Sequence, residues 1–356
     1  MLRVVDSGLR DARFNLSLTE ALSRGRRDGT TPDTLRFQHF PPSAIIGRHQ
    51  LLHREVDLDW VTANGVQTAR RMTGGGAIVM GPGLLGWELI LSRRIVPRGL
   101  DDATALICTG VADAVARFGV PAAYRPRNDV EVMGRKISGT GAYFDGEVLV
   151  FQGTVLVELD LGFMTSALRL PVRKLGKRGL AAMAERVTDL KTLLGTTPPM
   201  AQVQAEMAIS LAAALGLTPR EDVLTPVELA AAQVIEAAEI GTEAFVIGHD
   251  DALPMEGRIV AHCAQTAGGA IEVLLKLRDG TATVVDQALI TGDFFAEPPA
   301  IIPGLEAHLR GRPVQDLAGA TRWHLDAAGA QFLGVDREGF VAAIAGAAEV
   351  ALKDAP

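Results

Sequence analysis

Hydrophobic and polar positions along the first half of the chain follow the repeats of strands and helices. Residues 35–40 alternate apolar and polar side chains, which is typical of a strand with one buried face. Residues 101–118 instead carry apolar side chains every three or four positions, which predicts an amphipathic helix ended by Gly119 and Pro121. The same reasoning predicts strands at 2–6, 66–70, 77–80 and 84–91, a strand and turn at 44–50, and helices at 15–22 and 57–64.

The stretch 128–143 indicates a hairpin. Acidic residues and valines alternate in its first strand, Gly-Arg makes the turn, and Lys136, Ser138 and Thr140 then share one face of the returning strand. Because Asp129 precedes Lys136 by only a few residues, the hairpin is expected to place its carboxylate beside the ammonium group. The alternative is a plain meander in which the lysine extends into water.

Composition changes near residues 241–256, which read as a connector rich in glycine and acidic residues. A chain of 356 residues is long for one domain, so we expect one domain at 1–240 and another at 255–356. Before the connector, the pattern predicts a strand at 147–157 and helices at 200–215 and 225–240. After it, we expect strands at 259–264, 270–277 and 281–290 and helices starting at 305 and spanning 337–352.

Charge and composition exclude several classes of function. A net charge of −7 argues against a nucleic-acid or anionic-membrane surface, although a local basic site is expected from Arg70, Arg71, Arg125, Arg127, Arg135 and Lys136. Cys108 and Cys263 are far apart and lack metal-ligand spacing, and Cys108 is expected to be a small buried hydrophobic residue. The start of the chain shows no signal-peptide pattern, and no uninterrupted apolar run has membrane-spanning length, so we expect a cytoplasmic protein.

Residues 70–77, Arg-Arg-Met-Thr-Gly-Gly-Gly-Ala, carry the strongest chemical signal. Consecutive glycines let a ligand approach the main chain, and bared N–H groups form a concavity that binds anions. Arg70 and Arg71 place two positive charges at its edge. The alternative is a flexible turn beside solvated arginines.

This run resembles the signature of the lipoate–protein ligase and octanoyltransferase superfamily, whose fold is shared with biotin protein ligase. The resemblance implies an α/β (α+β) catalytic domain with a mixed β-sheet, in which the loop wraps an acyl chain and the phosphate of an acyl adenylate. It assigns acyl-adenylate binding to Arg70, Arg71, Thr73, Gly74, Gly75, Gly76 and Ala77. Residues 47–50 are similar to a Gly-Arg-x-Gln element beside the acyl pocket, which implies a ligand role for Arg48; an exposed charge at a strand end is the alternative.

The predicted hairpin resembles a second signature of the family. The residues that match it are Asn128 and Asp129, followed by Lys136, Ser138 and Gly139. The resemblance makes Lys136 the catalytic residue, contacting the acyl carbonyl and α-phosphate, and gives Asp129 the ordering of the nucleotide site and a possible place near Mg²⁺. The chemistry agrees, because a fixed ammonium stabilises the negative charge that develops on phosphate and carbonyl oxygens.

Other positions match the family less closely. Gln152, Gly153 and Thr154 stand where His-Gly-Thr is common, and these three are expected to line the substrate site. Met80 replaces a frequent histidine. The departures affect the identity of the acyl substrate more than the fold.

The family also implies a mobile connection and an accessory domain. Lys174 and Arg178 lie in a stretch similar to the lysine-rich cover over the adenylate, and we expect them to contact phosphate; a solvated basic helix end is the alternative. Gly-Asp-Phe-Phe at 292–295 looks like part of the small α+β C-terminal accessory domain of the ligases.

The resemblance therefore implies an ATP-dependent lipoate–protein ligase. Lipoate or octanoate would react with ATP and Mg²⁺ to give an acyl adenylate, and the acyl group would pass to a lysine of a lipoyl carrier, either an E2 lipoyl domain or a protein like the H protein of glycine cleavage. We expect a monomer with no nucleic-acid or membrane partner.

Three other functions stay open at the level of sequence. An octanoyltransferase would move the acyl group from acyl carrier protein without ATP and needs a nucleophile such as a thiolate. A non-catalytic lipoyl-carrier binding protein is made conceivable by the changes at Met80 and Gln152. A biotin ligase agrees less well with the second signature.

Overall fold

The computed structural model describes residues 1–170, 181, 183–248, 258–266, 269–278, 283–333 and 335–353. Its chain divides into two compact units. The larger unit comprises Met1–Ile46, His53–Arg71 and Ala77–Val246, and the smaller unit comprises Gly47–Leu52, Met72–Gly76 and Ile247–Pro356. The predicted domain division at 1–240 and 255–356 stays a prediction.

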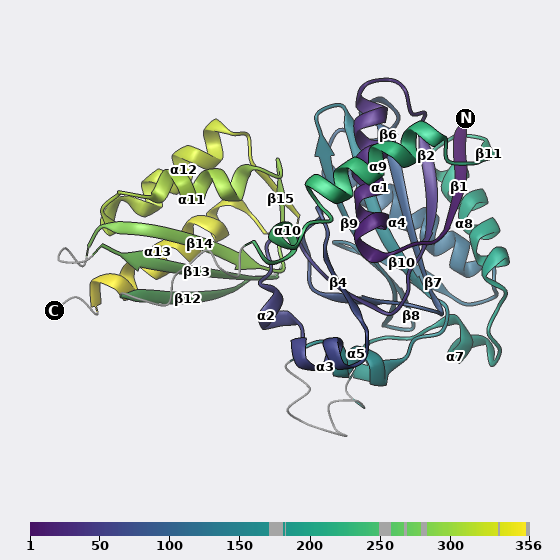
Figure 1. Cartoon of the computed structure of the whole chain (residues 1–356), viewed down its shortest axis with the longest axis horizontal. Helices are drawn as coiled ribbons and strands as arrows, with labels where there is room; N and C mark the ends of the chain where they lie inside the picture. Colours follow the sequence, from purple (N-terminus) through teal and green to yellow (C-terminus); the bar gives the residue numbers. More distant parts are fainter. Residues whose placement is uncertain are drawn as a thin grey trace. The chain divides into compact units, whose positions relative to one another are not determined.

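A mixed β-sheet forms the centre of the larger unit (Figure 1). The strands follow the order β11-β1-β2-β6-β10-β9-β8-β7; β1 runs parallel to β2 and β11, and the other pairs are antiparallel. The strands are β1 (Leu2–Leu9), β2 (Thr34–His39), β6 (Leu84–Ser92), β7 (Ala122–Arg125), β8 (Asp129–Val132), β9 (Arg135–Asp145), β10 (Val148–Leu156) and β11 (Pro219–Asp222). This arrangement confirms the predicted α/β class with a mixed sheet.

A separate small sheet precedes β6 in the chain. It has the order β4-β3-β5, with β3 (Ser43–Ile46) parallel to β4 (Gln67–Arg70) and antiparallel to β5 (Ile78–Met80). The predicted strand at 66–70 therefore leads directly towards the glycine run, as expected.

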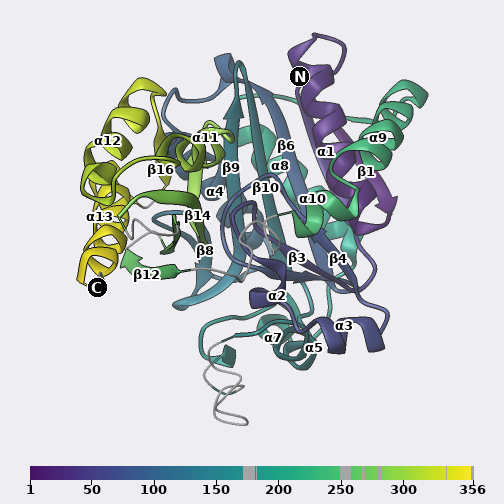
Figure 2. The same ribbon diagram turned by 60° about the vertical axis from the view of Figure 1, so that its left-hand side comes forward.

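Helices of the larger unit pack in pairs. α1 packs against α9 and α4 packs against α8, and α1 and α9 run side by side in both views of Figures 1 and 2. The long helices are α1 (Ala12–Arg27), α4 (Leu100–Ala116), α8 (Met200–Ala214) and α9 (Pro226–Ala238). The short ones are α2 (Leu52–Glu55), α3 (Leu58–Ala63), η1 (Arg93–Ile95), α5 (Leu161–Ala167), α7 (Leu190–Leu194) and α10 (Glu243–Ile247).

The two helix pairs cover opposite faces of the large sheet. Thr19 of α1 donates a hydrogen bond to Glu88 of β6, whereas Cys108 of α4 contacts Thr140 of β9. In the ladder, Glu88 pairs with Gln152 of β10, and Thr140 pairs with Gly153, the next residue of β10. Since successive strand residues point to opposite faces, Glu88 faces α1 and Thr140 faces α4.

A fully buried ion pair lies between α1 and the sheet. Arg36 Nε lies 2.6 Å from Glu88 Oε1, and both side chains have zero exposure. The same carboxylate accepts hydrogen bonds from Thr19, Gln38 and Gln152. A buried charge is tolerated when it is paired and its remaining lone pairs are satisfied, which this network achieves.

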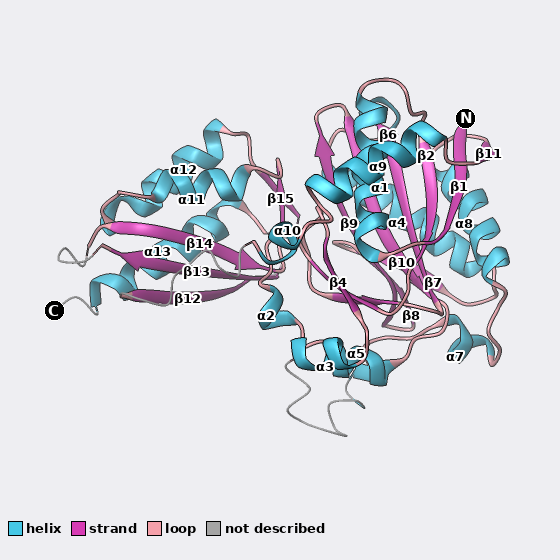
Figure 3. Ribbon diagram, in the orientation of Figure 1, coloured by secondary structure: helices cyan, strands magenta, loops and turns pink. Residues whose placement is uncertain are grey.

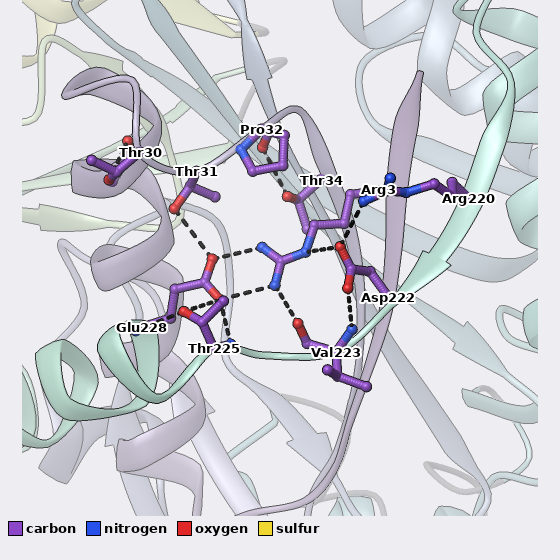
Figure 4. Close-up of polar contacts among 11 residues, drawn as sticks. Arg3, Thr30, Thr31, Pro32, Thr34, Arg220, Asp222, Val223, Thr225 and Glu228 are labelled. Atoms are coloured by element: carbon purple, nitrogen blue, oxygen red, sulfur yellow. Dashed lines mark hydrogen bonds and ion pairs between the residues drawn. The ribbon is translucent and has the colours of Figure 1, made fainter.

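Arg3 connects β1 to the start of α9 (Figure 4). Its guanidinium donates to both carboxylate oxygens of Glu228, at 2.6 and 2.9 Å, and to the carbonyl of Val223 at 2.6 Å. These hydrogen bonds with Glu228 raise the pKa of Arg3. Glu228 also completes a capping box with Thr225 at the start of α9, so one carboxylate both caps the helix and anchors it to the sheet.

The smaller unit is an α+β assembly (Figure 3). β12 (Ile259–Thr266), β13 (Gly269–Leu277) and β14 (Val285–Gly292) form an antiparallel sheet, and β15 (Phe295–Glu297) pairs with β16 (Gln331–Leu333). The helices are α11 (Ile301–Leu309), η3 (Val314–Asp316), α12 (Leu317–Ala327) and α13 (Arg337–Lys353).

The faces of this sheet differ in what covers them. Val273 and Leu275 of β13 belong to a buried core with residues of α11 and α13, whereas Leu274 points the other way and packs with Leu289 and Leu51. The sequence pattern missed α12, placed the start of α11 four residues late, and placed its last strand early, since β14 begins at Val285.

Candidate functional site

Lys136 and Asp129 form the ion pair that the hairpin predicted. Lys136 Nζ lies 2.7 Å from Asp129 Oδ1, with 39% of the lysine side chain exposed and 19% of the aspartate. Asp129 pairs with Gly139 in the β8–β9 ladder, and a register shift between Val130 and Glu131 lies between that pair and Lys136. The expectation that the hairpin sets an acid beside the lysine is confirmed.

Gly139 makes this geometry possible. A Cβ at this position would stand 2.6 Å from Lys136 Cε and Nζ, so the lysine side chain lies directly over the glycine. Any larger residue at 139 would displace the ammonium. The glycine in this signature therefore has a physical reason: it opens the strand surface for the lysine.

Asn128 and Thr140 fix the end of the same hairpin. The Asn128 carbonyl accepts from the amide and the hydroxyl of Thr140, at 2.9 and 2.8 Å, and the Asn128 side chain donates to the Thr140 carbonyl at 2.5 Å. Asn128 thus holds the start of β8 against β9, next to the ion pair. Ser138 is fully buried, and its hydroxyl has no hydrogen-bond partner among the described residues.

A segment that the sequence pattern did not pair with the hairpin lies beside Lys136. The amide of Lys136 donates to the Arg186 carbonyl at 2.8 Å, and the Thr188 amide donates back to the Lys136 carbonyl at 2.9 Å. This parallel bridge fixes the backbone of the lysine from its second side. Lys174 and Arg178, the predicted phosphate contacts, lie outside the described residues.

Gln152 and Gly153 belong to β10 but face opposite sides of the sheet. Gln152 donates to Glu88 at 3.1 Å and to Thr19 at 3.3 Å, on the face that α1 covers. A Cβ at Gly153 would lie 2.4 Å from the indole of Trp87, which is fully buried. Gly153 is therefore required by core packing. Thr154 is half-buried, and ligand roles for Gln152, Gly153 and Thr154 stay predictions.

The two arginines before the glycine loop differ in their surroundings. Arg70 is 1% exposed and donates to the carbonyls of Phe245 and Val246 near the end of α10, which is a structural contact that sequence reasoning did not anticipate. Burial lowers the pKa of Arg71 to about 10, which keeps it charged at neutral pH, and it donates to the Ile45 carbonyl at 3.4 Å. Their phosphate roles stay predictions.

Arg48 and the glycine loop belong to the smaller unit. The amide of Arg48 donates to the carbonyl of Thr73 at 3.0 Å, so the two predicted elements lie side by side. Gly75 has φ +87°, a left-handed conformation that favours glycine. Gly74 and Gly76 precede and follow it, and half-buried Ala77 begins the return to the larger unit.

Cys108 lies closer to the lysine site than its sequence position indicates. Its Sγ lies 3.5 Å from Thr140 Oγ1, but the residue is fully buried, and burial raises the thiol pKa to about 12. The expectation of a buried hydrophobic cysteine is confirmed. Cys263, by contrast, is exposed on β12.

The described part of the chain shows neither a metal-binding cluster of side chains nor a membrane-spanning helix. There, no three His, Cys, Asp or Glu side chains gather into a group able to hold a metal ion. No helix in the described ranges is both long and apolar enough to cross a bilayer.

A partly exposed lysine paired with a carboxylate on a mixed α/β sheet is an arrangement that can stabilise negative charge on a phosphate or carbonyl oxygen. The comparison with models of protein families identifies the family to which this chain belongs. The chain belongs to the lipoyl protein ligase A/B family, because the model of the lipoyl protein ligase A/B catalytic domain matches residues 11–212, more than half of the chain. It is an enzyme of the lipoate ligase and transferase group.

Curated relatives include both transferases and ligases. The octanoyltransferase LipM of Symbiobacterium thermophilum is 29% identical over 264 residues, which cover 68% of this chain and 96% of that protein. A probable lipoate-protein ligase A of Mycoplasma pneumoniae is 28% identical over 181 residues, 51% of this chain and 53% of the relative. The match to that ligase spans about half the length of each protein.

Solved structures show the same fold. The bipartite lipoate protein ligase of Thermoplasma acidophilum, studied with its E2 lipoyl domain, has a TM-score of 0.62 at 25% identity and covers 71% of this chain and 98% of its own. P. falciparum LipL1 in complex with lipoate matches 97% of this chain and 98% of its own with a TM-score of 0.71, at 16% identity. A lipoate-protein ligase A bound with ATP has a TM-score of 0.62 at 23% identity, over 70% and 99% of the two chains. The last two likenesses concern the fold alone.

Proposed function

We propose that this protein is an ATP-dependent lipoate–protein ligase. The observation that carries the proposal is the Lys136–Asp129 pair, in which a partly exposed ammonium is held at 2.7 Å from a carboxylate. A fixed cation of this kind stabilises charge that develops on oxygen atoms during acyl activation and transfer. The thiol pKa of Cys108, raised to about 12, supports ligation over transfer through a cysteine.

The first half-reaction activates the acid. A carboxylate oxygen of lipoate or octanoate attacks the α-phosphorus of ATP, and the bond to pyrophosphate breaks to give acyl-AMP. Lys136 would stabilise the negative charge on the α-phosphate. Asp129 would hold the ammonium in place and would offer a carboxylate to Mg²⁺. Because no described acidic cluster holds a metal by itself, we propose that Mg²⁺ enters with the ATP phosphates.

The second half-reaction transfers the acyl group. The neutral ε-amine of a carrier lysine attacks the acyl carbonyl, the bond to the phosphate oxygen breaks, AMP leaves, and the amine loses a proton. Lys136 would polarise that carbonyl. The Thermoplasma neighbour is described with an E2 lipoyl domain, which supports a lipoyl domain or an H-like carrier as the partner here. Arg125, which lies 3.8 Å from Asp129 and 2.9 Å from Glu131, and Arg127 are both exposed, and their charges would favour an acidic carrier surface.

An octanoyltransferase is the second candidate function, because LipM matches this chain over 96% of its own length. Such an enzyme would take octanoate from an acyl carrier protein without ATP. A transferase that works through a cysteine needs a reactive thiolate, and burial raises the pKa of the Cys108 thiol.

Pyrophosphate release from the purified full chain tests the proposal. ATP and Mg²⁺ are supplied with lipoate, octanoate, biotin or no acid, and Lys136→Ala is compared with Lys191→Ala, a surface lysine that is 51% exposed. We expect release that depends on lipoate or octanoate, is lost in the Lys136 variant and is kept in the Lys191 variant. Acyl transfer from octanoyl-acyl carrier protein without ATP, and no release with any acid, would establish the transferase instead.

A further inference from the structure

We propose that Phe294 is a positioning residue for the glycine loop, defined here as Met72–Gly76. Its main-chain carbonyl holds the loop, and its buried ring fixes that carbonyl to the core of the smaller unit. The inference rests on the proposed function only for its effect on acyl activation. The contacts themselves all lie within the smaller unit.

The close approach of Phe294 explains why residue 74 is glycine. The amide of Gly75 donates to the Phe294 carbonyl at 3.2 Å. A Cβ at Gly74 would stand 2.1 Å from that same carbonyl oxygen and 2.9 Å from Phe295 Cα. The Cβ of any other residue would therefore collide with main chain that cannot rotate away. The close approach of the Phe294 carbonyl is therefore sufficient to explain the glycine at position 74.

Phe294 is itself rigidly held. Its side chain is fully buried, meets Phe340 edge-on at 4.8 Å, and stacks on the ring of His49 at 4.9 Å with an interplanar angle of 14°. Aromatic contacts of this kind stabilise one arrangement of the rings beyond their burial alone. The ring thus connects the helical core of the smaller unit to the Gly47–Leu52 segment.

The end of β14 holds the neighbouring segment in the same way. The carbonyl of His49 accepts from the amide of Gly292 at 3.0 Å and from the hydroxyl of Thr291 at 2.6 Å. Arg48 in turn donates its amide to Thr73, the residue before the glycines. The segments Gly47–Leu52 and Met72–Gly76 are therefore fixed to β14 and to each other.

The consequence is a preorganised loop. A site that is already ordered before its ligand binds avoids the entropy cost of ordering it at that moment. The Gly75 amide is hydrogen-bonded to the Phe294 carbonyl, so it acts as an anchor of the loop. The Gly-Asp-Phe-Phe run then has a specific role in acyl activation: it sets the conformation of the loop predicted to hold the acyl adenylate.

Hydrogen exchange of the full chain, without acid or ATP, tests the anchor. In the wild type, the peptide that contains Gly75 should exchange slowly, and Gly74→Ala should speed that exchange about tenfold or more. Gly319→Ala is the matched control, because its added methyl group meets nothing within 4 Å in the same unit. Exchange of Gly75 at the rate of an unprotected amide, or the same slow exchange in Gly74→Ala, would overturn the inference.

A second variant pair reads out the effect on acyl activation. Thr291→Val removes the hydroxyl that holds the His49 carbonyl, and Thr291→Ser keeps it. We expect kcat/KM for pyrophosphate release to fall about tenfold in Thr291→Val and to recover in Thr291→Ser, with equal urea midpoints. Equal kcat/KM in the two variants would sink the positioning role. Hydrogen exchange does not depend on catalysis, so its result decides whether Phe294 anchors the loop. If the wild type releases no pyrophosphate, the proposed function is wrong, but the exchange result still holds.

Discussion

Lys136 lies over Gly139, with its ammonium 2.6 Å from the place where a Cβ would stand. We therefore predict that Gly139→Ala displaces the ammonium from Asp129 and lowers kcat/KM for pyrophosphate release about a hundredfold, because small displacements of a catalytic group have large effects on rate. The fold should tolerate the change, since the clashing atoms are the flexible end of a side chain. Steady-state kinetics and a urea midpoint measure the two effects.

Asp129→Asn provides the comparison for this variant. It keeps the shape of the side chain but removes the charge that holds the ammonium, so it should lower the rate while leaving the space over Gly139 open. A Gly139→Ala enzyme with wild-type kinetics would show that the position of Lys136 over the glycine does not matter for the reaction.

The hairpin and its ion pair were predictable because every contact is local in sequence. Asp129 and Lys136 are seven positions apart on the two strands of one hairpin, so the pattern predicts that their side chains lie close together, although it does not predict the register shift between Val130 and Glu131. The fold class was expected from the resemblance to the ligase family, and the mixed sheet confirms it. The bridge from Lys136 to residues 186–188 was not predictable, because a parallel pairing across so long a separation leaves no periodic signal in either segment.

The glycine loop shows a different limit of sequence reasoning. Three glycines indicate that something approaches the backbone, but the pattern does not say what. At Gly74 the approaching group is the carbonyl of Phe294, distant by more than two hundred positions. Arg70 is similar: its charge suggested a phosphate contact, which stays a prediction, but nothing in the pattern indicated that its guanidinium donates to carbonyls near the end of α10. Such long-range contacts have to be observed.

The two cysteines should differ sharply in reactivity. A thiol with a pKa of about 12 has roughly one thiolate in ten thousand at pH 8, and Cys108 is also inaccessible, whereas Cys263 is exposed. Iodoacetamide at pH 8 should therefore label Cys263 and leave Cys108 unmodified in the folded protein. Peptide mass spectrometry locates the label, and labelling in urea is the positive control.

The same environment predicts that Cys108 is dispensable for catalysis by a ligase. Cys108→Ala removes one buried sulfur and should cost roughly 1 kcal/mol of stability, with the rate of pyrophosphate release within about twofold of the wild type. Loss of all acyl transfer in a folded Cys108→Ala protein would contradict the ligase and indicate a thiol-based transferase.

Trp87 and Gly153 form a tightly fitted pair in the core of the larger unit. Because a Cβ at 153 would lie 2.4 Å from the indole, Gly153→Ala should lower the free energy of unfolding by about 1–3 kcal/mol through overpacking. Trp87→Phe in the same chain should recover part of that loss by removing the clashing atoms. A double-mutant cycle in urea measures the coupling between them. Simple additivity of the two single changes would contradict the predicted contact.

Glu306 makes the stability of the smaller unit depend on pH. Burial raises the pKa of Glu306 from 4.5 to about 7. The hydrogen bond that the Ile290 amide donates to Glu306 Oε1 at 2.8 Å acts in the opposite direction and lowers the pKa, but its effect is smaller. Between those values the folded state keeps a proton that the unfolded state has lost, so stability is greatest below about pH 4.5 and falls as pH rises through 7, by on the order of 3 kcal/mol. Hydrogen exchange of α11 and β14 peptides should therefore be slower at pH 5 than at pH 8 after correction for intrinsic rates. Glu306→Gln should remove that difference, and a difference that persists in the variant would assign it to another group.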